Sequence, residues 1–294
     1  HNGMLGLTFG TNALVRQCTI ISNNCRHFNV DHHAGGMKII PGICGGGDGA
    51  AGGVIEESEI AWNYGYGIWF DQCTGDYPRI VRNNYLHHNQ ATAVMIEISK
   101  GAQVYNNLMV SNGNGGIRLS ASDGIKVYHN TLVGNSGWAD LYVYGIPRAL
   151  CSDGSGITWA TIVSNEIVNN AVYDSRCQYD LVLMPESTSA AQVVRGNLCH
   201  HNLYYRPGGG LRFALAGVAS WNSLADWQTH TTNDADSLSV DPLLSASTAP
   251  PWAPGPDSPL VDRGAAGLPV NADYRSYPRP LDGNADGTAE PDRG

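Results

Sequence analysis

Two short stretches of the chain carry the residues best suited to chemistry. The segments GIWFDQ (residues 67–72) and AVMIEIS (residues 93–99) each place one carboxylate near the end of an apolar run, Asp71 in the first and Glu97 in the second. Two carboxyl groups about 5 Å apart are the arrangement used by double-displacement glycoside hydrolysis, one as nucleophile and one as acid/base. The pair has this chemistry only if the two stretches are neighbours in space, which depends on the elements that position them.

A repeat of 23 residues organises the chain. The pattern V-x-x-N-x-L-x-x-N begins at Val81 and recurs at Val104 and Val127, each time 23 residues later. Looser copies begin at Val15, Ile55, Ile162 and Val194. A unit this short must stack on its neighbours to bury an apolar face, which predicts a right-handed parallel β-helix of about seven or eight coils. The 36 glycines and the low charged fraction of 15% also favour an all-β protein rich in turns.

Each repeat also carries an asparagine at a fixed position. At a bend between strands, a buried side-chain amide can donate to the next coil and satisfy polar groups inside the turn. We therefore expect one ladder of stacked amides running along the β-helix. Its expected members are Asn84, Asn107, Asn130, Asn165 and Asn197.

The regular repeats fade after Leu211, which divides the chain into a β-helix (residues 1–215) and a C-terminal capping region and tail (residues 216–294). The tail is rich in Pro and Gly, resembles the tail of exported bacterial β-helix proteins, and is expected to cover the last coil. The opening residues read as a strand partway through a coil. An uncovered coil is a template for pairing, so end-to-end self-association through it is a further expectation.

With the repeat in phase, the strands after the motif align and alternate inward and outward. One outward column is predicted to contain Trp69, Met95, Arg118 and Tyr142, and the next contains Asp71 and Glu97. Since neighbouring coils lie about 4.8 Å apart, the two carboxyl groups should be roughly 5 Å apart. Trp69 is expected to be an exposed aromatic that binds a sugar, and Arg118 to keep one carboxylate ionised.

The segment from GIWFDQC to VYNNLMV resembles a signature of β-helical glycosidases similar to the β-xylosidases of glycoside hydrolase family 120. In those proteins a GIWxD strand is followed one coil later by a hydrophobic-E-hydrophobic strand. The resemblance implies that Asp71 is the nucleophile and Glu97 the general acid/base of a retaining glycosidase, which needs no cofactor. The 294 residues are fewer than those enzymes contain, and we expect no counterpart of their additional domain among them.

Two other functions stay open at this point. In a Ca²⁺-dependent polysaccharide lyase, Asp71 and Glu97 would bind the cation while Lys100 or Arg118 acts as the base. Alternatively, the protein has no catalytic activity and is a structural or adhesive protein of the cell surface or of a filament. A deep groove over the carboxylates would favour an enzyme, whereas burial of the His1 end between copies would favour the structural protein.

Further candidate residues lie outside the carboxylate pair. His32, His33 and Lys38 in VDHHAGGMKI, together with Tyr142 and Lys100, are predicted to contact substrate beside the cleft. The spacing of Asp282, Asn284 and Asp286 matches the first half of a calcium loop, without its closing bidentate Glu.

Charge and cysteines give the remaining expectations. A formal charge of −9 without a basic stripe argues against a nucleic-acid partner. No apolar run reaches the length of about eighteen residues that a membrane-spanning helix needs. The seven cysteines predict an exported or cell-surface protein with two disulfides, Cys25–Cys44 and Cys151–Cys177, and with Cys18 and Cys199 as buried thiols.

Overall fold

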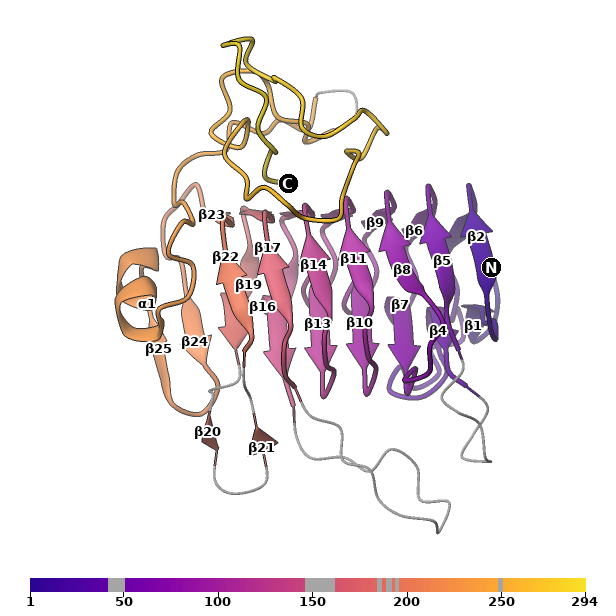
Figure 1. The fold of residues 1–294 in the computed structure, drawn as a ribbon. Coiled ribbons are helices and arrows are strands. Elements are labelled where there is room, and N and C mark those ends of the chain that lie inside the picture. Colours follow the sequence, from indigo (N-terminus) through magenta and orange to yellow (C-terminus); the bar gives the residue numbers. More distant parts are fainter. Residues whose placement is uncertain (42–50, 146–161, 184–186, 189–191, 194–195, 248–250) are drawn as a thin grey trace.

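The computed structural model describes residues 1–41, 51–145, 162–183, 187–188, 192–193, 196–247 and 251–294. The chain winds into a parallel β-helix in which each coil contributes one short strand to each of three sheets (Figure 1). The predicted fold class is therefore confirmed.

The three sheets are named A, B and C. Sheet A contains β1 (Leu5–Leu7), β4 (Gly35–Ile39), β7 (Tyr66–Asp71), β10 (Val94–Glu97), β13 (Ile117–Ser120), β16 (Ser136–Tyr144), β19 (Arg176–Leu183) and β24 (Phe213–Leu215), with the antiparallel β25 (Ala219–Trp221) at its edge. Sheet B contains β2 (Ala13–Arg16), β5 (Gly53–Glu56), β8 (Arg79–Arg82), β11 (Gln103–Tyr105), β14 (Lys126–Tyr128), β17 (Glu166–Val168) and β22 (Leu198–His200). Sheet C contains β3 (Thr19–Ile21), β6 (Glu59–Ala61), β9 (Tyr85–His87), β12 (Leu108–Val110), β15 (Thr131–Val133), β18 (Ala171–Tyr173) and β23 (Leu203–Tyr205). A separate hairpin joins β20 (Ser187–Thr188) to β21 (Gln192–Val193).

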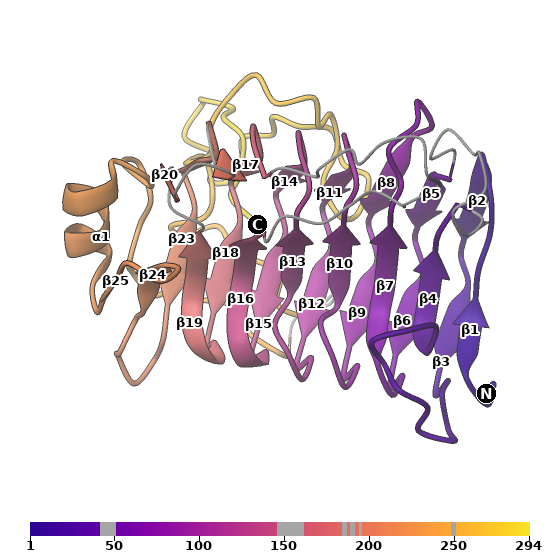
Figure 2. The same cartoon turned by 90° about the horizontal axis from the view of Figure 1, so that it is seen from below.

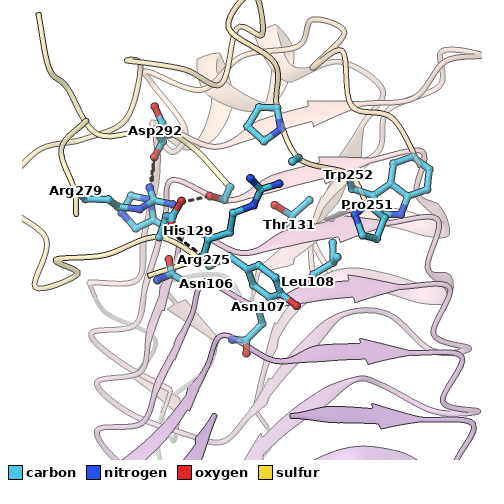
Figure 3. A pocket seen from close by; sticks show the side chains of 15 residues that line it. Asn106, Asn107, Leu108, His129, Thr131, Pro251, Trp252, Arg275, Arg279 and Asp292 are labelled. Carbon is cyan, nitrogen blue, oxygen red and sulfur yellow. Dashed lines mark hydrogen bonds between the residues drawn. The ribbon is translucent and has the colours of Figure 1, made fainter. Parts of the chain in front are cut away.

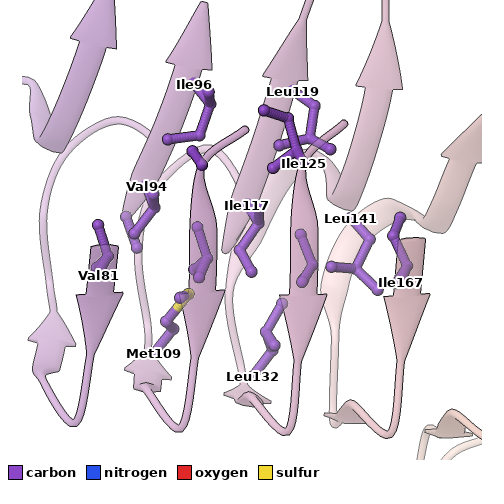
Figure 4. Packing of buried hydrophobic residues seen from close by; sticks show 14 of the residues in the cluster. Val81, Val94, Ile96, Met109, Ile117, Leu119, Ile125, Leu132, Leu141 and Ile167 are labelled. Carbon is purple, nitrogen blue, oxygen red and sulfur yellow. The ribbon is translucent and has the colours of Figure 1, made fainter. Parts of the chain in front are cut away.

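The repeat motif spans two strands rather than one. Its first Val lies on sheet B, and its Leu position lies on sheet C after a bend at the first Asn. Val81, Val104 and Val127 are direct neighbours along sheet B, as the 23-residue spacing predicts. These valines and the inward residues of sheets A and C form one apolar core inside the coils (Figure 4).

The predicted phase of the later repeats is wrong by five residues. Val127 pairs with Ile167 rather than with Ile162, and Ile167 pairs in turn with Cys199 rather than with Val194. The reason is that the later copies carry their two Asn residues at other bends: Asn165 lies before sheet B, and Asn170, five residues later, lies between sheets B and C. A five-residue shift therefore matches the pattern almost as well as the correct phase.

The same shift divides the predicted asparagine ladder. Asn84, Asn107 and Asn130 stack at the bend between sheets B and C, where each Nδ2 donates to the Oδ1 of the next residue at 3.0 Å, and Asn130 continues to Asn170. Asn165 and Asn197 stack at a different bend, before sheet B, with an Nδ2 to Oδ1 distance of 2.9 Å.

A second ladder, which the sequence reasoning missed, lies at the bend that leads into sheet A. Asn63 donates to Asn89 at 2.8 Å, Asn89 to Asn112 at 3.0 Å, and Asn112 to Asn135 at 3.0 Å. Gly67 is required beside it, because a Cβ there would lie 2.6 Å from the Ala93 carbonyl oxygen. This ladder holds the strands of sheet A in register immediately before the segments that carry the carboxylates.

A short helix covers the last coil. Helix α1 (Leu224–Thr231) is capped at its N-terminus by Ser223, whose side chain accepts a hydrogen bond from the amide of Asp226. Its Leu224 and Trp227 side chains are part of the same core as Phe213 in β24. The end of the β-helix is therefore closed by α1.

The first part of the tail contacts the last coil, where Leu244 and Leu260 pack with Leu203 of β23. The rest of the tail runs back along the flank of the middle coils (Figure 1). Asn83 Nδ2 donates to the carbonyl oxygens of Asp273 and Tyr274, both at 3.1 Å. Val270 packs against Tyr105 and Tyr128 on the outer face of sheet B. The outward aromatic residues of sheets B and C form the surface that the tail covers.

His129 is the buried centre of this tail contact (Figure 3). Nδ1 lies 2.6 Å from Arg279 Nη1 and 2.9 Å from the carbonyl oxygen of Asp292, and Nε2 lies 3.3 Å from Asn169 Nδ2. Arg279 and Asn169 are N–H donors, and a protonated imidazole has no acceptor to offer them. Burial, followed by the charge of Arg279, holds the pKa of His129 well below its ordinary value.

We expect acidification to loosen the tail through His129. Because the pKa of His129 is lowered in the folded state, its imidazole takes up a proton when the tail detaches. The docked tail therefore loses stability as the pH falls below about 6.5, by up to about 1.4 kcal/mol per pH unit. The raised pKa of Asp292, caused by burial, acts in the opposite direction. Limited proteolysis of the tail at about pH 7 and about pH 5.5 measures the net change. The His129→Gln variant should have a smaller pH dependence; an unchanged dependence would contradict the assignment.

The predicted disulfides are not present in the described residues. Cys25 and Cys177 have free thiols, and Cys44 and Cys151 lie outside the described residues. Cys199 is buried, as predicted, whereas Cys18 is exposed. Cys18 lies at the bend between sheets B and C in the first described coil, where its amide donates to Ser58 Oγ of the next coil. No earlier described coil covers it.

Candidate functional site on the outer face of sheet A

The two carboxylates lie on adjacent strands of sheet A, in register. β7 and β10 pair in parallel with Asp71 opposite Glu97 and Trp69 opposite Met95. Figure 2 shows these strands side by side. The predicted outward columns are therefore correct, and the ordinary strand spacing of about 4.8 Å places the two acidic residues next to each other. Both are nearly buried, with 7% of Asp71 and 5% of Glu97 exposed.

Lys38 on β4 provides the positive charge of this site. It pairs in register with Trp69, and its Nζ lies 3.0 Å from Asp71 Oδ2. The same Nζ donates to the carbonyl oxygen of His32 at 2.7 Å and lies 3.3 Å from the centroid of the Trp69 ring. Since both partners are buried, this ion pair fixes the position of the Asp71 carboxylate beside Glu97.

Trp69 is not the exposed aromatic that we predicted. Only 4% of it is exposed, and it packs in a small cluster with Tyr66, Ala91 and Met95. The Tyr66 ring lies 4.9 Å from it, and the Lys38 ammonium covers its ring. Trp69 therefore supports the lysine that contacts Asp71 and does not offer an open face to a sugar.

Each carboxylate has its own neighbours on sheet A. Asp71 contacts the Lys38 ammonium, and Glu97 pairs in register with Asp71 on one side and with the buried Ser120 of β13 on the other.

The two predicted histidines flank the ion pair. His32 supplies the carbonyl oxygen that Lys38 contacts. His33 is an exposed residue whose pKa is lowered, first by partial burial and then by the charge of Lys38, while Asp71 acts in the opposite direction. The ring of His33 is therefore within electrostatic range of both members of the ion pair.

Arg118 and Tyr142 lie further along the same face, on β13 and β16. The Arg118 guanidinium lies over the Tyr142 ring, 5.5 Å from its centroid, and Tyr142 stacks on Tyr144 at 5.2 Å. Lys38 has the position that we expected for Arg118, beside a carboxylate. A direct role of Arg118 in chemistry stays a prediction.

Lys100 lies outside the strands, in the turn between sheets A and B. Its side chain is exposed, and its carbonyl oxygen accepts a hydrogen bond from Arg79 Nε at 2.7 Å. Its predicted contact with substrate, and its role as the base of a lyase, stay predictions.

The predicted calcium residues form a loop in which their side-chain oxygens accept hydrogen bonds from the backbone amides of the same loop. The two carboxylate oxygens of Asp282 accept from the amides of Asp286 and Gly287, at 3.1 and 2.9 Å. Asn284 Oδ1 accepts from the same Asp286 amide at 2.9 Å. Among the described residues, no group of three His, Cys, Asp or Glu side chains is placed to hold a metal ion. Calcium binding at this loop stays a prediction.

These observations define a class: a parallel β-helix protein with a buried lysine and two acidic residues on the outer face of one sheet. The chain belongs to the family described as right-handed β-helix region, whose model matches residues 1–135 and 41–202. Comparison with curated proteins and with solved structures gave no match. None of the described helices is long and apolar enough to cross a membrane.

Proposed function

We propose that this protein is an extracellular carbohydrate-active enzyme, specifically a retaining glycoside hydrolase that uses Asp71 and Glu97. The observation that carries the proposal is the register of β7 and β10, which makes the two acidic residues direct neighbours. Adjacent strands give a separation close to the roughly 5 Å of retaining enzymes and shorter than the 6.5–9.5 Å or so of inverting enzymes.

The resemblance to the β-helical glycosidases assigns Asp71 as the nucleophile and Glu97 as the acid/base. The Lys38 ammonium, 3.0 Å from Asp71 Oδ2, supports this assignment because it holds the Asp71 carboxylate in place beside Glu97. Asp71 would attack the anomeric carbon while Glu97 donates a proton to the leaving oxygen. Glu97 would then take a proton from water as that water displaces Asp71 from the sugar.

The lyase alternative has weaker support. The ammonium of Lys38 already contacts Asp71 and the His32 carbonyl, so Asp71 has less capacity to bind Ca²⁺. Of the two candidate bases, Lys100 lies in a turn outside the strands of sheet A, and the Arg118 guanidinium lies over the Tyr142 ring. The structural alternative does not require acidic residues in register.

The test compares wild type with Asp71→Asn and Glu97→Gln on a panel of plant and microbial polysaccharides. Release of reducing ends, reduced about a thousandfold in both variants, is the expected result. The ultraviolet absorbance of an unsaturated uronate product, dependent on added Ca²⁺, would instead identify a lyase. No activity on any polysaccharide would favour the structural protein.

Azide separates the two roles on a substrate with an activated leaving group. In Glu97→Ala, azide should attack the sugar attached to Asp71 and give a glycosyl azide of retained configuration. In Asp71→Ala, azide should attack the substrate itself and give the inverted product. The opposite stereochemistry in the two variants would exchange the assigned roles.

A further inference from the structure

A second feature of the outer face of sheet A is a pocket of about 300 Å³ near the end of the β-helix. It lies where β16 and β19 meet the hairpin of β24 and β25. Its lining comprises Trp138, Tyr142, Tyr179, Val182, Ala214 and residues 215–220. A volume of this size is at the lower end of pockets that hold small molecules.

The pocket is built from three aromatic side chains, Trp138, Tyr142 and Tyr179, over a floor of small apolar residues. Trp138 and Tyr179 meet edge to face, with ring centroids 5.2 Å apart and an interplanar angle of 65°. Trp138 is 45% exposed, so much of its ring is open to solvent. Val182 and Ala214 are buried partners in register and form the floor.

The chemistry of the lining favours an uncharged ligand with both apolar and hydroxyl groups. None of the described lining residues is an acid, a lysine, an arginine or a histidine. Exposed aromatic rings offer flat apolar faces, and the tyrosine hydroxyls and the hairpin backbone offer hydrogen bonds. A sugar ring has an apolar C–H face and a rim of hydroxyl groups. A chain of uronates would bring negative charge to a protein that already carries −9.

The pocket lies on the same outer face of sheet A as the carboxylate site. Tyr142 lines the pocket and pairs in register with Arg118, which pairs with Met95 on the strand of Glu97. Two coils separate β10 from β16, which corresponds to about 10 Å at the ordinary strand spacing. A single extended ligand lying across the coils could therefore contact both places.

We propose that the Trp138–Tyr179 pocket is a binding subsite for a neutral oligosaccharide. The pocket would bind the same glycan that is cleaved at Asp71 and Glu97 only if the proposed function is correct. Binding of a neutral oligosaccharide to the pocket does not depend on the proposed function. The pocket would hold the substrate chain at a distance from the reacting bond and would select neutral glycans over polyuronates.

Calorimetric titration of the Asp71→Asn protein tests the binding without turnover. The neutral probes are cellohexaose, xylohexaose and mannohexaose, and the acidic probe is a galacturonate hexamer. We expect at least one neutral probe to bind, and Trp138→Ala and Tyr179→Ala to weaken it about tenfold or more, since aromatic residues often dominate binding. Trp138→Phe should keep most of the affinity. Trp62→Ala, which removes an exposed tryptophan elsewhere, is the matched control and should leave binding unchanged.

Failure of the subsite and failure of the proposed function are distinguishable. No binding of any neutral probe, equal binding by Trp138→Ala, or tighter binding of the galacturonate hexamer would overturn the subsite. If hydrolysis is then found with an unchanged KM in Trp138→Ala, the hydrolase stands without it. If neutral probes bind through Trp138 but no polysaccharide is cleaved, the subsite stands and the hydrolase fails.

Discussion

Replacing Lys38 by methionine should destabilise the β-helix by about 3–5 kcal/mol and abolish any activity that depends on Asp71. Removal of one partner of a buried ion pair leaves the other charge buried and uncompensated. Lys38 and Asp71 have side chains only 5% and 9% exposed, and their charged atoms are 3.0 Å apart. The variant also loses the contact of the ammonium with the Trp69 ring. Urea denaturation of wild type and Lys38→Met measures the loss.

A double variant separates the ion pair from packing. Lys38→Met combined with Asp71→Asn removes both charges, so it should be more stable than Lys38→Met alone. Lys100→Met is the matched control, because Lys100 is exposed in a turn, and its effect should be within about 0.5 kcal/mol. A Lys38→Met protein as stable as Lys100→Met would show that the ion pair does not hold this face together.

Truncation of Trp227 to alanine should have a comparable effect at the other end of the molecule, with a loss of about 3–5 kcal/mol. Trp227 is fully buried, stacks on Phe213 at 5.7 Å, and donates from Nε1 to Asp234 Oδ2 at 2.9 Å. Asp234 is itself buried, and burial raises its pKa. The truncation therefore leaves a cavity under α1 and removes one of the donors that stabilise this carboxylate.

Because stacked repeats contact only their neighbours, the damage should be local. Hydrogen exchange in Trp227→Ala should accelerate in β23 and β24 but not in β10. Trp227→Phe keeps a ring without the N–H and should cost about 1–2 kcal/mol, which isolates the hydrogen bond. Trp62→Ala, at a tryptophan that is 57% exposed, is the size-matched control. Equal losses in Trp227→Ala and Trp62→Ala would contradict the capping role of α1.

The repeat period determined most of the fold and the central part of the site. The 23-residue spacing of Val81, Val104 and Val127, together with strand alternation, was sufficient to place Asp71 beside Glu97 on an outer face. This inference worked because neighbouring coils of equal length stack residue on residue. Where the coils differ in length, around Ile162, the phase was ambiguous by five residues, since the later copies keep the same Asn spacing at other bends.

Only the tertiary structure decided the features that join segments without a common period. Lys38 lies before residues 42–50, so its pairing with Trp69, and hence its contact with Asp71, depends on a coil whose length the repeat does not fix. That contact buries Trp69, which alternation alone had placed on an exposed face. The contact of the tail with His129 also joins segments that share no repeat period. The same is true of the contact between Trp138 and Tyr179, which lie on coils of different length. Periodic, nearest-neighbour contacts can be predicted from the sequence, whereas contacts across insertions depend on three-dimensional packing.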